Sequence, residues 1–124
     1  MQAFKTKGFA RFARQEEISD RSLAEAIERA ERGIVDADLG YGLIKQRVAR
    51  PGQGRSGGYR TIVAYMVNKR AVFIHGFAKS HRENITQDQL QALRKVAANW
   101  LALESPKMQE AIQDGALQEI DCER

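Results

Sequence analysis

The sequence predicts an α+β fold in which helices pack on one side of an antiparallel sheet. Two observations support this class. Apolar residues follow helical spacing near the beginning and near the end of the chain, whereas residues 43 to 78 are rich in the alternating and β-branched patterns typical of strands. The expected order of elements is βααβββα. A length of 124 residues suits one domain over residues 1–124, with a core at about 2–104 and a C-terminal extension at about 105–124.

The first third of the chain is expected to form one strand and two helices. Residues 2 to 6 can make a short strand, and helical spacing begins at about Gly8. A second helix is expected after Ser19, whose side chain can cap it, and should end near Gly33. Its apolar stripe is formed by Leu23, Ile27, Ala30 and Ile34.

Three consecutive antiparallel strands are expected next, at residues 43–49, 59–67 and 71–78. The third strand is apolar on both faces, which predicts a central position in the sheet. Strict alternation places three of its side chains, Phe73, His75 and Phe77, on one face.

Helical spacing returns after Thr86, which forms a capping box with Gln89. This helix is expected to continue to about Leu103. A weaker helix at about 107–113 and a short strand at 116–120 can follow it in the C-terminal extension.

Positive charge is concentrated in one part of the sequence. The net charge is only +4 at pH 7, but residues 39 to 82 contain nine basic residues and no acidic one, which gives this segment a charge of +9. The other eighty residues carry −5. A basic segment beside an acidic remainder predicts a surface that binds a polyanion, with nucleic acid as the first candidate. The alternative is a solvated sheet face guarded by lysine and arginine.

The composition argues against several classes of protein. Cys122 is the only cysteine, so neither an internal disulfide nor a cysteine zinc site is expected, and a reducing cytoplasm suits the chain. The longest apolar run, residues 61–67, is too short for a membrane span, and the N-terminus has no signal-peptide core. Because His75 and His81 are the only histidines and no carboxylate lies near them before Glu83, no metal is expected. The glycine-rich stretch at 52–57 leads into a strand rather than a helix, so no dinucleotide or other cofactor is expected either.

The basic segment contains the groups needed to cleave RNA without a metal. Such cleavage requires a base for the 2′-hydroxyl, cations for the charged transition state and an acid for the departing oxygen. Lys45 and Arg47 lie about 7 Å apart along one strand and can follow successive phosphates. Arg60 offers a bidentate guanidinium. His81 can carry protons near pH 7, whereas His75 is expected to be a core or supporting residue. The same cations would serve equally for passive RNA or DNA binding.

Three motifs, two in this segment and one directly after it, resemble those of a known toxin family. Residues 50–61 read Arg-Pro-Gly-Gln-Gly-Arg-Ser-Gly-Gly-Tyr-Arg-Thr, residues 72–79 read Val-Phe-Ile-His-Gly-Phe-Ala-Lys, and residues 83–85 read Glu-Asn-Ile. Together they resemble the RelE/HigB branch of the RelE/ParE toxin superfamily. The resemblance implies a small microbial-RNase-like toxin of a bacterial type II toxin-antitoxin pair. Such a toxin is an mRNA interferase, which cleaves messenger RNA on the ribosome and thereby inhibits translation.

The resemblance also implies partners and site residues. The partners are the ribosome, the messenger RNA and an antitoxin that is often a small helix-turn-helix protein. Arg60 matches the family arginine that holds the scissile phosphate, and His81 or a lysine with a lowered pKa remains as the general base. The expected catalytic residues are Arg60, Lys79 and His81. The expected RNA-binding residues are Lys45, Arg47, Arg50, Arg55 and Arg82.

Two other functions remain open from the sequence. A ParE-like toxin would share the fold but would act by binding DNA gyrase, without catalytic side chains. A non-enzymatic nucleic-acid-binding module would use the same cations for binding alone.

Overall fold

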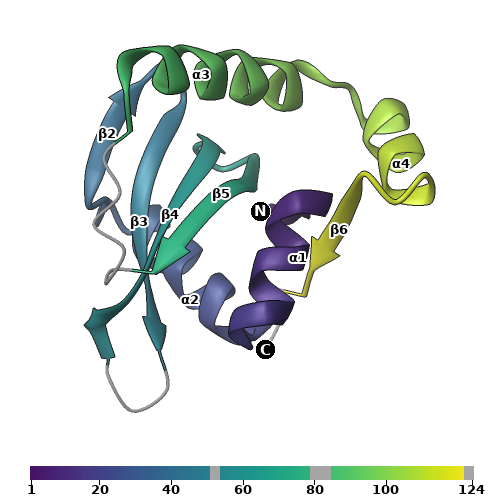
Figure 1. Ribbon diagram of the computed structural model, residues 1–124. Helices are drawn as coiled ribbons and strands as arrows, with labels where there is room; N and C mark the ends of the chain where they lie inside the picture. Colours follow the sequence, from purple (N-terminus) through teal and green to yellow (C-terminus); the bar gives the residue numbers. More distant parts are fainter. Residues whose placement is uncertain (51–53, 79–84, 122–124) are drawn as a thin grey trace.

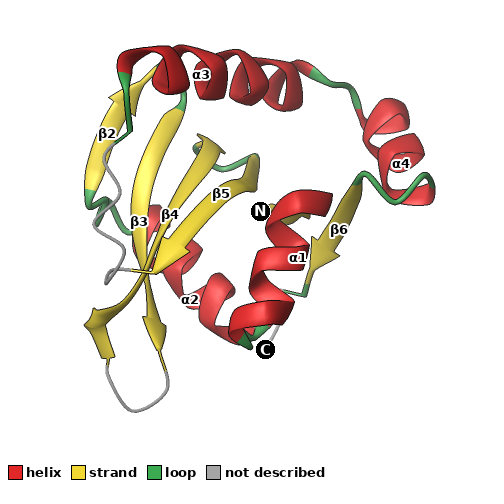
Figure 2. Ribbon diagram, viewed as in Figure 1, coloured by secondary structure: helices red, strands yellow, loops and turns green. Residues whose placement is uncertain are grey.

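The computed structural model describes residues 1–50, 54–78 and 85–121, and within them the chain forms one six-stranded sheet and four helices (Figures 1 and 2). The expected α+β class is confirmed. The strand order across the sheet is β2-β3-β4-β5-β1-β6. The elements in chain order are β1 (Gln2–Thr6), α1 (Lys7–Glu16), α2 (Asp20–Glu31), β2 (Ala37–Gly40), β3 (Leu43–Arg50), β4 (Gly54–Met66), β5 (Arg70–Ala78), α3 (Gln87–Ala102), α4 (Ser105–Gln113) and β6 (Leu117–Ile120).

Helix starts agree with the local capping signals in the sequence. The side chain of Ser19 accepts a hydrogen bond from the backbone nitrogen of Ser22 at the start of α2. Thr86 and Gln89 form the expected capping box at the start of α3, with both reciprocal hydrogen bonds present. These contacts satisfy backbone N–H groups that a helix cannot pair internally, so a few adjacent residues determine where the helix begins.

The sheet is mixed, which corrects the expectation of a wholly antiparallel sheet. Strand β1 pairs in parallel with β5, from Gln2 opposite Arg70 to Lys5 opposite Phe73, and pairs antiparallel with β6. The other pairings are antiparallel, and β5 is central as expected. The direction of β1 depends on a partner more than sixty residues away, and local sequence patterns carry no information about such a pairing.

Helices cover both faces of the sheet, so the expectation that they pack on one side is wrong. On one face α1 and α2 pack over a core that includes Val63 and Phe73, and we call this the α1/α2 face. On the opposite α3/α4 face, Ile62 and Val72 pack with residues of α3 and α4. Val72 and Phe73 are neighbours in β5 and both are fully buried. A strand that is apolar on both sides requires cover on both sides.

Two short strands lie at the edges of the sheet. Strand β2 was not anticipated, because its sequence includes Asp38 and Gly40, residue types that are depleted in strands. Strand β6 pairs with β1, and Met108 of α4 is buried against the α3/α4 face. The segment that the sequence placed outside the core therefore contributes to the sheet and to the core. No helix in the described part of the chain is long and apolar enough to cross a membrane.

Candidate functional site

Strand register places three of the expected site residues on one face of the sheet. Arg47 on β3 is the direct cross-strand partner of Arg60 on β4, and Lys45 pairs with Ile62. Residues paired in this way project to the same side of a sheet. Ile62 is buried on the α3/α4 face, so Lys45, Arg47 and Arg60 also project there. Arg47 is exposed, and the other two side chains are half-buried.

His75 joins this group from β5. Phe77 pairs with Arg60, and His75 pairs with Ile62, so His75 lies diagonally across from Arg60. Lys45 occupies the equivalent diagonal position on the other side of Arg60. Diagonal neighbours on one face are about 7–8 Å apart, within reach of long side chains. We call the four residues Lys45, Arg47, Arg60 and His75 the basic face.

The grouping of His75 with Phe73 on one side of β5 was wrong, because a β-bulge interrupts the strand. Ile62 pairs with His75, whereas the next residue, Val63, pairs with Phe73. Ile74 is therefore the extra residue, and it reverses the alternation of everything that follows it in β5. Phe73 packs on the α1/α2 face, and half-buried His75 lies on the other face. Strict alternation along β5 predicts the wrong face for His75, because nothing in the local sequence indicates the bulge.

The side chains of four expected site residues lie outside the described part of the structure. Lys79, His81 and Arg82 lie outside the described residues. The backbone of Arg55 belongs to β4, but its side chain also lies outside the described part. Their catalytic and RNA-binding roles stay predictions.

Arg50 is separated from the basic face. Its guanidinium carbon lies 5.5 Å from the centre of the Tyr59 ring, and Tyr59 packs on the α1/α2 face. Val48 packs on the same face, and Arg50 follows it by two residues, so alternation along β3 already places Arg50 there. Arg50 also borders a hollow of about 330 Å³ that Glu16 and Glu17 line. These two glutamates reduce the positive potential around Arg50.

Arg70 adds to the charge of the basic segment but does not belong to a positive surface. The residue is 3% exposed, and its Nη1 donates to the carbonyl oxygens of Trp100 at 2.7 Å and Leu103 at 2.8 Å. Carbonyl groups at the end of a helix lack internal partners and carry partial negative charge. Arg70 therefore caps α3, and the charge of +9 overstates the positive surface of the segment.

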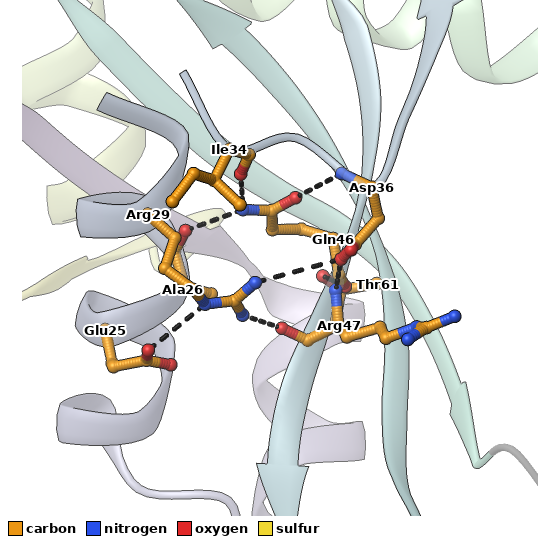
Figure 3. Close-up of polar contacts among 8 residues, drawn as sticks. All are labelled: Glu25, Ala26, Arg29, Ile34, Asp36, Gln46, Arg47 and Thr61. Carbon is orange, nitrogen blue, oxygen red and sulfur yellow. Dashed lines mark hydrogen bonds and ion pairs between the residues drawn. The ribbon is translucent and has the colours of Figure 1, made fainter. Parts of the chain in front are cut away.

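A buried glutamine holds β3, the strand of Lys45 and Arg47, against α2 (Figure 3). Gln46 is fully buried and projects to the α1/α2 face. Its Nε2 donates to the carbonyl oxygens of Ala26 at 2.9 Å and Ile34 at 3.0 Å, and its Oε1 accepts from the backbone nitrogen of Asp36 at 3.0 Å. These hydrogen bonds connect the strand to the helix and to the segment that follows the helix.

Arg29 of α2 adds a second connection to β3. Its guanidinium donates to the backbone carbonyl oxygen of Arg47 and, at 3.1 Å, to the carboxylate of Glu25. The carboxylate of Asp36 accepts from the backbone nitrogen of Arg47 at 2.6 Å (Figure 3). The backbone of Arg47 is thus held on both sides by charged groups, while its side chain remains exposed on the basic face.

The basic face is suited to hold phosphate groups. In the described part of the chain, no carboxylate forms an ion pair with the side chains of Lys45, Arg47 or Arg60. Unpaired lysine and arginine side chains on one surface attract polyanions, and two adjacent guanidinium groups can share the oxygens of one phosphate. No group of three or more His, Cys, Asp or Glu in residues 1–50, 54–78 and 85–121 is arranged to hold a metal ion.

Comparison with protein families gives a match over nearly the whole chain. The family model for the RelE toxin of the RelE/RelB toxin-antitoxin system matches residues 1–120. This range includes all the strands and helices of the described structure and the whole basic face. No curated protein matches the chain significantly.

Proposed function

The chain belongs to the RelE toxin family, and from this premise we propose that it inhibits translation by cutting messenger RNA on the ribosome. Membership makes it a toxin of a toxin-antitoxin system and implies an antitoxin as partner. The observation that carries the proposal is the position of Arg60, which has Arg47 directly beside it and Lys45 and His75 on its two diagonals. Such a cluster of cations and a titratable group matches the needs of phosphodiester cleavage.

The proposed reaction is a transesterification within the RNA chain. A 2′-oxygen attacks the adjacent phosphorus, and the bond from phosphorus to the 5′-oxygen breaks. The 2′-hydroxyl gives its proton to a base on the toxin, and the departing 5′-oxygen receives a proton from an acid. The products are a 2′,3′-cyclic phosphate and a 5′-hydroxyl. Negative charge builds on the phosphate oxygens during the step, so fixed guanidinium groups accelerate it.

Each residue of the basic face has a role in this proposal. Arg60 holds the scissile phosphate through two parallel hydrogen bonds, and Lys45 and Arg47 hold that phosphate and its neighbour. The proton-transfer group is either His75 on the basic face or one of the two residues His81 and Lys79 that follow β5. Arg55 and Arg82 extend the RNA contacts, and Arg50 contacts RNA only if the message passes around the sheet to the α1/α2 face.

The biological setting follows from the same proposal. Ribosome dependence, a cytoplasmic site of action and an antitoxin of the helix-turn-helix type are proposed from the resemblance of the motifs to RelE/HigB toxins. The chemistry uses side chains alone, so no cofactor is included.

A reconstituted translation reaction tests the proposal. A defined message is translated with and without the toxin, and the ends of the fragments are mapped and analysed chemically. We expect new fragments that end in a cyclic phosphate, only while ribosomes translate the message. Intact messages together with inhibition of DNA gyrase in a supercoiling assay would reject cleavage in favour of a gyrase-binding toxin.

Two variants give this experiment a matched comparison. Arg60→Ala removes the central cation and should abolish the fragments. Lys69→Ala removes one positive charge from the exposed turn before β5, away from the basic face, and should leave them unchanged. Equal loss of the cleavage fragments in both variants would mean that net charge, rather than the position of Arg60, determines activity.

A further inference from the structure

A small pocket opens beside the basic face, between β5 and the first turns of α3. Its volume is about 210 Å³, and the described residues that line it are His75, Ile85, Gln89, Ala92 and Leu93. The lining is mainly aliphatic. His75 is shared by the two features, since it forms a wall of the pocket and is the diagonal neighbour of Arg60. The mechanism proposed for phosphate cleavage leaves the other four residues without a role.

The pocket has the chemistry of a site for one flat heteroaromatic ring. Drug-sized ligands occupy larger pockets, of roughly 300–1,000 Å³. Single-stranded RNA is recognised through bases that leave the stack, lie against histidine or aromatic rings and form hydrogen bonds along their edges. His75 supplies a ring, and Ile85 and Leu93 supply apolar surface for the remainder of a base.

Gln89 supplies a donor at the edge of the pocket. Its Oε1 accepts from the backbone nitrogen of Thr86 at 2.9 Å as part of the capping box. That hydrogen bond fixes which end of the amide faces the helix start. The NH₂ group donates to no described residue, and it can therefore donate to a carbonyl oxygen or ring nitrogen of a base.

The position of the pocket relative to Arg60 favours a nucleobase as its occupant. His75 is about 7–8 Å from Arg60, as diagonal neighbours are, and in RNA only a sugar separates a phosphate from its base. A phosphate held by Arg60 therefore brings an adjoining base to the mouth of the pocket. The positive charge of the basic face favours an RNA strand over an uncharged ligand of similar size.

We infer that this pocket binds one base of the message next to the scissile phosphate and thereby sets a nucleotide preference. The inference rests on the proposed function, because it uses RNA at the basic face. It adds a specificity pocket formed by His75, Gln89 and Leu93. Ala92 forms part of the pocket wall on an exposed stretch of α3, so a larger side chain there fills the pocket without disturbing the core.

Direct binding measurements test this inference without requiring cleavage. Four labelled pentaribonucleotides, which carry A, C, G or U between uridines, are titrated with the wild type and two variants. Ala92→Leu fills the pocket. Ala98→Leu places the same change at another exposed position of α3 and serves as the matched control. Leucine is a good helix former, so both helices should persist.

The wild type should bind its preferred base roughly tenfold more tightly than the poorest one, because stacking tolerates every base and one hydrogen bond to a base edge changes affinity by about that factor. Ala92→Leu should lose this preference, and Ala98→Leu should keep it. Gln89→Glu preserves the capping box but replaces the donor with a negative charge, and it should also lose the preference.

The outcomes separate this inference from the proposed function. Equal binding of the four oligonucleotides by the wild type, or a preference that survives in Ala92→Leu, would overturn the pocket assignment even if messages are cut. A preference that depends on Ala92, combined with intact messages in the translation reaction, would support the pocket and reject cleavage.

Discussion

Arg47 and Arg60 face each other on adjacent strands, and no described carboxylate lies in an ion pair with either side chain. Favourable cross-strand pairs contribute roughly 0.2–1 kcal/mol, whereas like charges placed directly opposite destabilise a sheet. A bound phosphate between the two guanidinium groups removes this repulsion. The pair therefore destabilises the fold when no anion is bound, and it favours the binding of an anion.

Replacing Arg47 should change stability and RNA binding in opposite directions. Arg47→Gln relieves the repulsion and should raise the free energy of unfolding by about 0.5 kcal/mol, as measured by urea denaturation. The variant should bind single-stranded RNA more weakly, and the slope of log affinity against log salt should fall by about one. Lys69→Gln is the control. An unchanged salt slope in Arg47→Gln would remove this residue from the RNA contacts.

Loss of the buried amide of Gln46 should destabilise the fold strongly. Gln46→Met keeps a similar size but leaves the backbone groups of Ala26, Ile34 and Asp36 without their partner. Unpaired buried polar groups cost about 1–3 kcal/mol each, so we expect a loss of about 3 kcal/mol. Gln118→Met, the same change at an exposed position of β6, should cost less than about 0.5 kcal/mol. Similar values for the two variants would contradict the structural role of Gln46.

Replacing Arg70 should affect stability much more than replacing Lys69, although the two residues are neighbours with the same charge. Arg70→Met removes the cap of α3 and should lower the free energy of unfolding by about 2–3 kcal/mol, because charged hydrogen bonds to carbonyl oxygens are lost. Lys69→Met should have little effect on stability, since its side chain is exposed. Neither change should alter the salt dependence of RNA binding. A clear decrease of that dependence in Arg70→Met would place this arginine at the RNA surface.

Buried Tyr59 and half-buried Tyr65 should respond differently to loss of the hydroxyl. The Tyr59 hydroxyl donates to the backbone carbonyl oxygen of Glu16 at 3.2 Å, so Tyr59→Phe should cost about 1 kcal/mol. The Tyr65 hydroxyl is buried and has no hydrogen-bond partner in the described structure. Tyr65→Phe should therefore be neutral or slightly stabilising at pH 7. Thermal unfolding of both variants measures the difference, and a cost for Tyr65→Phe equal to that for Tyr59→Phe would be inconsistent with these environments.

The same tyrosines should make the protein sensitive to alkaline pH. Burial raises the pKa of Tyr59 and the pKa of Tyr65 above the ordinary value of 10.0. An unfolded chain loses these protons near pH 10, whereas the folded protein retains them to higher pH. Ionisation therefore favours the unfolded state, so this contribution to stability is complete below pH 10 and declines as pH rises further. Stability above pH 10 should decline less steeply in the double variant Tyr59→Phe/Tyr65→Phe than in the wild type.

Local signals were sufficient to predict most elements of the fold. Ser19 and the Thr86 capping box mark helix starts through contacts within three residues, and the structure confirms both. The parallel pairing of β1 with β5 was missed, because it joins residues that are far apart in the chain. The short strand β2 was missed because its residue types disfavour strands.

The candidate site was only partly predictable for similar reasons. Alternation along β3 placed Lys45 and Arg47 together, and the structure agrees. His75 was assigned to the wrong face because the bulge at Ile74 depends on how β4 and β5 pair. Arg70 was counted with the surface charges, although its partners are carbonyl groups about thirty residues away at the end of α3.

The rate at which Arg60→Ala cuts a ribosome-bound message, compared with the wild type, tests the account most directly. A single-turnover assay with toxin in excess isolates the cleavage step. Removal of one group that stabilises transition-state charge typically lowers the rate by about 10²–10³, and we expect a decrease of that size with the fold intact. A rate within about twofold of the wild type corresponds to a difference of only about 0.4 kcal/mol in activation free energy. Such a rate would contradict the central position assigned to Arg60.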